Sequence, residues 1–191
     1  IEALTSAGIA HKVGVDIVWV DSKKLKTEED VSEALKGVKG ILIPGGFGKK
    51  GIEGMFLACK YARENNIPYL GICLGMQVAL IEYARNVLGI KEASSAEFEA
   101  DTKEPIITLM EGKNKEMIGG TLRLGLYPCS LKKGSLAEKI YGKEEIKERH
   151  RHRYEFNNDY REKFEGSSLE FSGVNKEKNL VEMIELKDHK W

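Results

Sequence analysis

One short run, residues 69–77, most constrains what this chain can fold into. It reads Tyr-Leu-Gly-Ile-Cys-Leu-Gly-Met-Gln and follows Pro68. The apolar residues before Cys73 predict a buried strand, and those after it repeat at helical spacing, so a strand, a sharp turn and a helix meet at this thiol. Gly71 and Gly75 lack a Cβ, which permits a tight turn and the close approach of another molecule. The run therefore predicts a nucleophile elbow with Cys73 at its tip.

The setting of Cys73 decides between two interpretations. An isolated cysteine in an apolar run is usually a core residue. Here glycines flank the thiol and a helix begins at once, so backbone N–H groups and the helix dipole favour a thiolate. We expect unusual backbone angles at Cys73, as elbow nucleophiles have. Cys59 is expected to be buried on an apolar helix face, and Cys129 to lie near a strand edge without an activating neighbour.

Length, charge and cysteine content exclude several other classes of protein. A chain of 191 residues predicts one domain. The 30 basic and 30 acidic residues give no net field to attract nucleic acid or a charged membrane. Three cysteines at irregular spacing exclude a disulfide scaffold and fit a reducing cytosol, so the expected location is cytoplasmic. The apolar stretches are far shorter than the ~20 residues of a membrane span.

Strand and helix patterns alternate along the first half of the chain. This order predicts an α/β fold, with a central, mostly parallel sheet flanked by helices on both faces. The chain then changes after Pro105, where short apolar runs are separated by glycine-rich and charged stretches. The expected strands are residues 16–20, 40–43, 69–72, 106–109 and 180–184, and the expected helices are residues 28–35, 52–64 and 74–88.

A glycine-rich loop, residues 44–51, follows one of these strands. It reads Pro-Gly-Gly-Phe-Gly-Lys-Lys-Gly and falls at the same sheet edge as Cys73. Its spacing matches neither a dinucleotide-binding fingerprint nor a Walker A loop. Alone it fits an ordinary turn equally well. Beside an elbow it favours an oxyanion-hole loop, whose N–H groups face developing negative charge.

Residues 148–155 form a second polar motif, Glu-Arg-His-Arg-His-Arg-Tyr-Glu. Such a run is most often a solvated basic segment. It is short and bounded by glutamates, which argues against a nucleic-acid arm. An arginine held here could instead bind a substrate carboxylate through its two-pronged guanidinium.

Together these motifs closely resemble the glutamine amidotransferase (class I, triad type) domain of the CTP synthases. The elbow is specific only to class I amidotransferases, whereas the loop Gly-Gly-Thr-Leu-Arg-Leu-Gly and the Arg/His motif narrow the resemblance to the CTP synthases. The resemblance implies a flavodoxin-like α/β architecture and one amidotransferase domain over residues 1–191. The matching stretches are residues 43–48, 71–89, 94–98, 119–125 and 148–155.

The resemblance also implies an activity. L-Glutamine would be hydrolysed through a γ-glutamyl thioester on Cys73, and the ammonia would pass to a synthetase domain that converts UTP to CTP with ATP. Gln77 and Glu97 would hold the amino end of glutamine, and Arg153 its α-carboxylate. By position, the oxyanion hole is assigned to the backbone N–H groups of Gly46 and Leu74, and glutamine binding to Gly46, Leu74, Gln77, Glu97 and Arg153.

The expected partners follow from the same family. No cofactor or metal is expected in this domain, since ATP and Mg belong to the synthetase domain. GTP is a possible activator acting on residues 119–125, but Lys50 departs from the family's loop and leaves a GTP role at that position open. The partners expected are L-glutamine and the synthetase domain, with neither nucleic acid nor membrane, in a homo-oligomer of the full-length enzyme.

One departure concerns the triad. None of the four histidines, His11, His150, His152 and His189, is followed by Pro-Glu. The resemblance therefore implies that residues 1–191 lack the family's first strand and its C-terminal His-Pro-Glu segment. Two alternatives remain: a non-catalytic regulatory module that binds glutamine or a partner, and an amidotransferase of another pathway, against which residues 119–125 argue.

Overall fold

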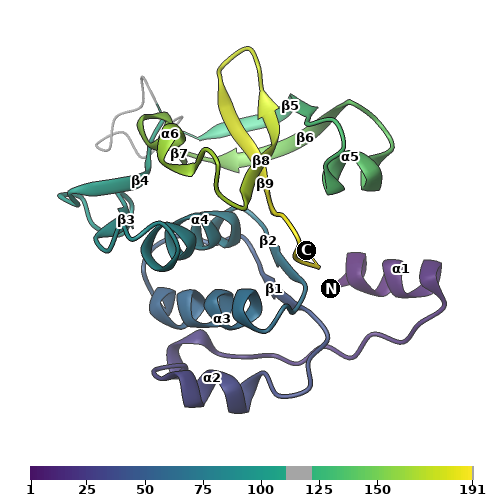
Figure 1. The fold of residues 1–191 in the computed structure, drawn as a ribbon. Helices are drawn as coiled ribbons and strands as arrows, with labels where there is room; N and C mark the ends of the chain where they lie inside the picture. The colour runs from purple at the N-terminus through teal and green to yellow at the C-terminus, as the bar shows by residue number, and fades with distance from the viewer. Residues whose placement is uncertain (111–121, 191) are drawn as a thin grey trace.

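The computed structural model describes residues 1–110 and 122–190 (Figure 1). The helices are α1 (Glu2–His11), α2 (Glu28–Ala34), α3 (Ile52–Glu64), α4 (Leu74–Asn86), α5 (Leu136–Tyr141) and α6 (Arg161–Phe164), with short 3-10 turns at Ser22–Lys24 and Asn158–Tyr160. The strands are β1 (Ile41–Ile43), β2 (Tyr69–Gly71), β3 (Ala93–Ser95), β4 (Glu104–Leu109), β5 (Arg123–Leu131), β6 (Glu145–His152), β7 (Tyr154–Phe156), β8 (Leu169–Asn175) and β9 (Leu180–Leu186).

A parallel pair, β1 and β2, carries the elbow. Ile41 lies opposite Tyr69 and Ile43 opposite Gly71. Figure 1 shows α3 and α4 side by side against these strands. Their apolar faces form the core together with the strands, and burying each such side chain stabilises the fold by roughly 1.5–3 kcal/mol. The largest cluster of buried side chains includes Ile43, Phe56, Val78, Ile81 and Ile107.

The remaining strands form two further sheets. In the first, β4 lies between β3, which runs parallel to it, and β7, which runs antiparallel. The second is an antiparallel sheet with the order β6-β5-β8-β9. The fold is therefore α/β, as predicted, but its sheets are mixed and its parallel part is smaller than the sequence suggests. Antiparallel strands follow where the chain turns back in short connections after Pro105.

The strand expected at residues 16–20 is wrong. This segment has no regular secondary structure, and Val18 and Trp19 are 64% and 78% exposed. Apolar, β-branched residues raise strand propensity, but a strand forms only where a neighbour offers N–H and C=O groups. Among the described residues, β1 is paired with β2 alone. The segment instead links α1, which extends to one side of the main body in Figure 1, to the 3-10 turn at Ser22–Lys24.

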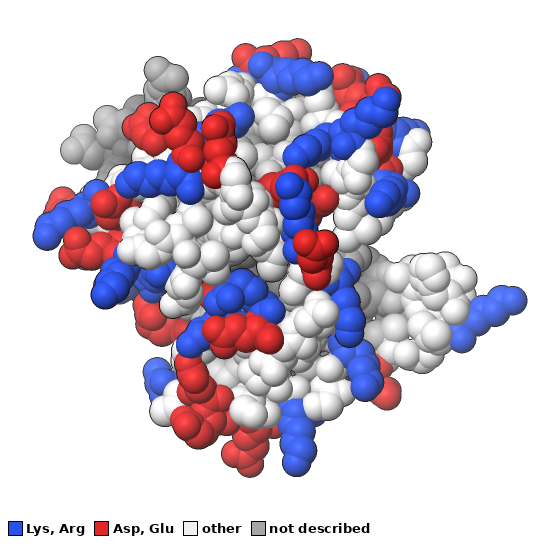
Figure 2. Space-filling model, viewed as in Figure 1, with Lys and Arg blue, Asp and Glu red and all other residues white. Residues whose placement is uncertain are grey.

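The predicted helices form close to their expected bounds. Thr27 caps α2 in a reciprocal capping box with Asp30. Helix α3 spans the expected residues, and α4 ends at Asn86, two residues before the expected end. No helix of the described residues combines the length and apolar character needed to cross a bilayer. On the face seen in Figure 2, acidic and basic side chains are interspersed, consistent with the balanced charge of the chain.

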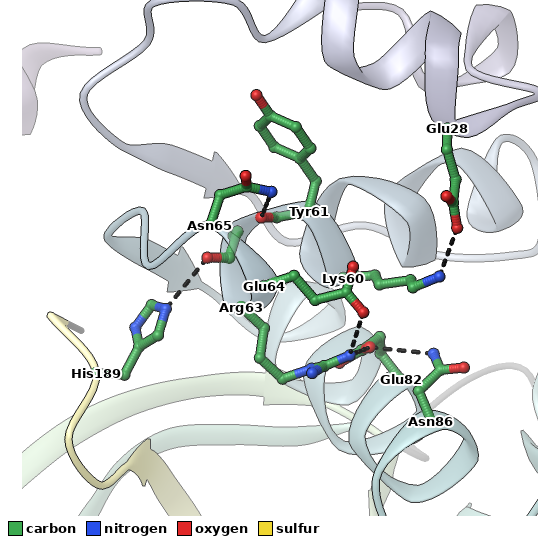
Figure 3. Close-up of polar contacts among 10 residues, drawn as sticks. Glu28, Lys60, Tyr61, Arg63, Glu64, Asn65, Glu82, Asn86 and His189 are labelled. Carbon is green, nitrogen blue, oxygen red and sulfur yellow. Dashed lines mark hydrogen bonds and ion pairs between the residues drawn. The ribbon is translucent and has the colours of Figure 1, made fainter.

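A buried ion pair joins α3 to α4 (Figure 3). The Glu82 side chain is 1% exposed and accepts hydrogen bonds from Nε and Nη2 of Arg63 at 2.7–3.2 Å. Asn86 Nδ2 donates a further bond of 3.1 Å to the same carboxylate. The Arg63 donors come from α3 and the Glu82 carboxylate lies on α4, so these bonds persist only while both helices keep this spacing.

Replacing Arg63 with alanine tests this dependence. Removing one partner leaves Glu82 buried with a lone amide donor, and the expected loss of unfolding free energy is about 3 kcal/mol. Lys60→Ala is the matched control. Lys60 lies on α3, like Arg63, but pairs with the exposed Glu28 of α2, so its loss should cost less than about 1 kcal/mol. Urea unfolding measures both. Equal losses would show that the α3–α4 pair contributes no more than a surface pair.

Candidate active site

The elbow forms as the sequence predicts. Cys73 lies between the end of β2 and the start of α4, with φ 54° and ψ −102°. A positive φ at a residue with a Cβ costs of order 1–3 kcal/mol and persists only where the surroundings enforce it. The first turn of the helix enforces it here: Gly75 N–H donates to Ile72 O at 3.0 Å, and Gln77 N–H donates to Cys73 O at 3.2 Å.

The two flanking glycines are sterically required. A Cβ on Gly71 would lie 2.4 Å from the carbonyl carbon of Gly75, and a Cβ on Gly75 would lie 2.2 Å from Ile43 O. Both separations are shorter than any van der Waals contact. The Tyr69 hydroxyl donates to Gly75 O at 2.7 Å and fixes the turn from the strand side.

The glycine-rich loop lies directly against the elbow. The Cβ position of Gly45 falls 3.5 Å from Cys73 Cβ, and that of Gly46 falls 3.2 Å from Leu74 Cδ2. The backbone N–H groups of Leu74 and Gly46 both lie close enough to the Cys73 thiol to lower its pKa. N–H groups from two different segments therefore lie beside this thiol, as an oxyanion hole next to it would require.

Opposing influences act on the ionisation of Cys73. Burial raises the pKa of this thiol above its ordinary value, and the negative charges of Glu97 and Glu155 add to the rise. The N–H groups of Leu74 and Gly46 lower the pKa, but by less. Within the described residues the helix N-terminus therefore does not yield a thiolate by itself, and attack by the sulfur requires a base.

The other proposed site residues lie on segments that meet at this point. Glu97 Oε1 accepts a hydrogen bond of 2.8 Å from Gly48 N–H, which ties it to the glycine-rich loop. Gln77 is buried on α4, and its Nε2 donates to Tyr154 O at 3.3 Å. Arg153 is half-buried between β6 and β7, and its carbonyl accepts from Met110 N–H at 3.0 Å. Their roles toward glutamine remain predictions.

A cavity of about 630 Å³ opens beside the thiol. Cys73, Gln77 and residues 181–186 of β9 line it, whereas Gly46, Leu74, Glu97 and Arg153 do not. His150, His152 and Glu155 also line it. This volume is in the usual range for small-molecule sites.

Sequence reasoning missed a buried charged cluster next to this cavity. Arg123 Nη1 lies 2.7 Å from Glu182 Oε1 and 3.5 Å from Glu155 Oε1, and the three side chains are at most 5% exposed. Burial raises the pKa of Glu155 to about 8. Arg123 sits among apolar residues near the start of β5, and Glu182 within β9. A charged residue inside an apolar strand was the available signal.

The other two thiols are sealed from solvent. Burial raises the pKa of Cys59 far above its ordinary value and that of Cys129 to about 12. Cys59 lies on the buried face of α3, as predicted. The expectation that Cys129 lies near a strand edge is wrong. Cys129 lies within β5, where it pairs with Ile146 of β6, and β5 has β8 as its neighbour on the other side.

The segment assigned to GTP is described only in part. Residues 119–121 lie outside the described residues. The rest of the motif leads into β5, where Arg123 joins the buried cluster and Leu124 is 57% exposed.

The elbow, the paired N–H groups and the α/β layers define a class of protein. The model of the family "Glutamine amidotransferase class-I" matches residues 1–191, and the chain belongs to this family. Individual relatives of the chain give a more specific similarity than the family as a whole. It is 60% identical over 190 residues to the CTP synthase of Treponema denticola and 55% identical over 192 residues to that of Bacillus subtilis.

A solved structure agrees with these relatives. The glutaminase domain of Trypanosoma brucei CTPS, with bound acivicin, superposes with a TM-score of 0.92 at 37% identity and covers all of this chain and 75% of that one. These findings confirm the predicted resemblance and the predicted α/β amidotransferase architecture. The chain spans 35% and 36% of the two bacterial enzymes.

Gly75→Ala tests how tightly the elbow is packed. The new methyl group must displace the Ile43 carbonyl, and the expected cost is about 1–3 kcal/mol of unfolding free energy. Gly14→Ala is the control, because its Cβ meets nothing within 4 Å. Chemical denaturation of both variants gives the comparison. A Gly75 variant as stable as the Gly14 variant would mean that β1 and α4 are not held this closely.

Proposed function

We propose that this chain is the glutamine-hydrolysing part of a CTP synthase. The observation that carries the proposal is the strained Cys73 elbow, with the backbone N–H groups of Gly46 and Leu74 beside its thiol. The Treponema denticola and Bacillus subtilis relatives support it by name, and the Trypanosoma brucei neighbour supports it by its glutaminase domain. An amidotransferase of another pathway has no comparable support.

The chemistry proposed is acyl transfer through the sulfur. A base removes the thiol proton, and the Cys73 sulfur attacks the side-chain amide carbon of glutamine. The oxygen, which gains the negative charge, accepts hydrogen bonds from the N–H groups of Gly46 and Leu74. The C–N bond then breaks, the nitrogen takes a proton and leaves as ammonia, and water hydrolyses the γ-glutamyl thioester to glutamate. The family resemblance assigns the base to a His-Pro-Glu segment, which residues 1–191 do not contain.

Recognition of glutamine is proposed to use both charged ends of the amino acid. Glu97 would receive the ammonium group, since its carboxylate already lies beside the loop that flanks Cys73. Gln77 would support the same end from α4. Arg153 would bind the α-carboxylate from the junction of β6 and β7, because a guanidinium forms paired hydrogen bonds with a carboxylate.

The wider assignments rest on the relatives. The ammonia would go to a synthetase domain that aminates UTP with ATP and Mg, and GTP would act as an activator. We propose a cytoplasmic, homo-oligomeric enzyme, and this domain itself would need no cofactor. Because the Trypanosoma brucei domain is described with bound acivicin, we propose that acivicin also binds this chain at Cys73.

Cys73→Ala in the full-length enzyme tests the thioester. Glutamine-dependent CTP synthesis should fall at least about 10⁴-fold, while synthesis from free ammonia is retained. In the unmodified enzyme, an electrophilic glutamine analogue should label Cys73, and the sealed Cys59 and Cys129 should stay unlabelled, as read by peptide mass spectrometry. Full glutaminase activity in the alanine variant would refute the thioester. An unmodified full-length enzyme without any glutaminase activity would favour the non-catalytic, glutamine-binding module.

Arg153→Ala tests substrate anchoring. The apparent KM for glutamine should rise roughly 10- to 100-fold, because a charge-assisted, paired contact of about 1.5–3 kcal/mol is lost. The KM for ammonia should not change, since ammonia carries no carboxylate. Arg151→Ala is the matched control, because Arg151 is exposed two residues away and should leave both constants unchanged. An unaltered glutamine KM in the Arg153 variant removes this residue from the site.

A further inference from the structure

Two histidines and a glutamate gather outside the Cys73 machinery. His150 and His152 lie on β6, and Glu182 lies on β9. One ligand atom from each falls within 4.8 Å of the others. We infer that His150, His152 and Glu182 form a binding site for one divalent metal ion of the zinc class.

The strand geometry explains why these side chains meet. Residues two apart on a strand point to the same face, so His150 and His152 share the inner face of β6. Arg149 and Arg151 point outward between them and are exposed. The side chain of Glu182 reaches this face from β9 at the other edge of the antiparallel sheet. The three side chains are 11%, 14% and 3% exposed, so the cluster is largely shielded from solvent.

The hydrogen bonds fix the histidine tautomers. The carbonyl of Tyr154 can only accept, so its 3.2 Å contact with His152 Nδ1 places the proton on that nitrogen. The Nε2 of His152 then accepts from His150 Nδ1 at 2.7 Å. In this hydrogen-bond pattern the His150 proton lies on Nδ1, so its Nε2 presents a lone pair.

This lone pair faces a carboxylate. His150 Nε2 lies 3.5 Å from Glu182 Oε2, is buried, and has no hydrogen-bond partner among the described residues. Two acceptors that face each other repel unless a cation lies between them. At metal–ligand bonds of ~2.0–2.1 Å, two donors on one tetrahedral zinc ion lie roughly 3.3 Å apart. The observed gap therefore suits a shared metal ion, and the ligand atom of His152 lies within 4.8 Å of the other two.

The charges around the three proposed ligands also permit a cation to bind. Arg123 is paired with two buried carboxylates, Glu155 and Glu182. Because burial raises the pKa of Glu155 to about 8, the cluster carries at most one more negative charge than positive and no net positive charge. Lys178, which also acts on Glu155, is exposed. Arg123 holds Oε1 of Glu182, which leaves Oε2 directed at His150.

The supporting contacts are those of known metal sites. A histidine ligand commonly donates its second ring N–H to a backbone carbonyl, as His152 does to Tyr154, and a carboxylate ligand is held by another side chain, as Glu182 is by Arg123. Two imidazoles and one carboxylate favour zinc, or cobalt and nickel as its substitutes, over magnesium or calcium. The bound ion would join β6 to β9 across the sheet.

The test measures metal directly in the full-length protein. After removal of metals with a chelator, Co²⁺ is titrated and its visible absorption followed, and bound Zn²⁺ is counted by elemental analysis. We expect one equivalent per chain that His150→Asn weakens at least ~100-fold, because loss of an outer contact alone costs 10- to 100-fold. His11→Asn, on the exposed end of α1, should retain this equivalent.

Two further measurements keep the inference falsifiable. Cys73→Ser should bind the ion as the unaltered protein does, so loss of binding in that variant would show that the thiol holds the metal and would overturn the site. If His150→Asn does not fold, carbethoxylation of histidines in the unaltered protein replaces it. Zn²⁺ should then protect His150 and His152 but not His11, and equal modification of all three with and without Zn²⁺ refutes the inference.

Discussion

The site depends on one backbone constraint, the positive φ of Cys73. A residue with a Cβ adopts such angles only when its surroundings outweigh the strain. Here β2 and α4 are packed so closely that the positions of Gly71 and Gly75 leave no space for a side-chain atom. The same packing brings the Leu74 N–H group to the sulfur. The strain at Cys73, the close contacts at Gly71 and Gly75 and the position of the Leu74 N–H group are therefore parts of one geometric arrangement.

Local signals account for what the sequence could predict. The helices α2, α3 and α4 follow from caps and apolar periodicity, and the elbow follows from glycines at fixed distances around one thiol. The strand expected at residues 16–20 failed because strand formation depends on a partner elsewhere in the chain, which its own residues do not encode. The pKa of Cys73 likewise depends on more than its neighbours in the sequence. Burial is set by the whole fold, and here it outweighs the favourable helix N-terminus.

The buried cluster of Arg123, Glu155 and Glu182 shows the same limit at longer range. Its members come from β5, β7 and β9 and are 27 to 59 positions apart, so no local pattern joins them. The charged residues stand inside otherwise apolar strands, and that mismatch marks each as unusual without naming its partner. Only the folded structure, which brings β5, β7 and β9 together, shows that these side chains are partners.

The contact between Glu97 and Gly48 N–H couples two tasks that are usually considered separately. The carboxylate that we propose for the ammonium group of glutamine also anchors the loop to which we assign one oxyanion donor. Natural variation at this position is thus constrained twice, by the ligand and by the shape of the loop. Amidotransferases that evolve toward another amide donor would have to rebuild the loop together with the acid, so their specificity would change in a concerted step and not by single replacements.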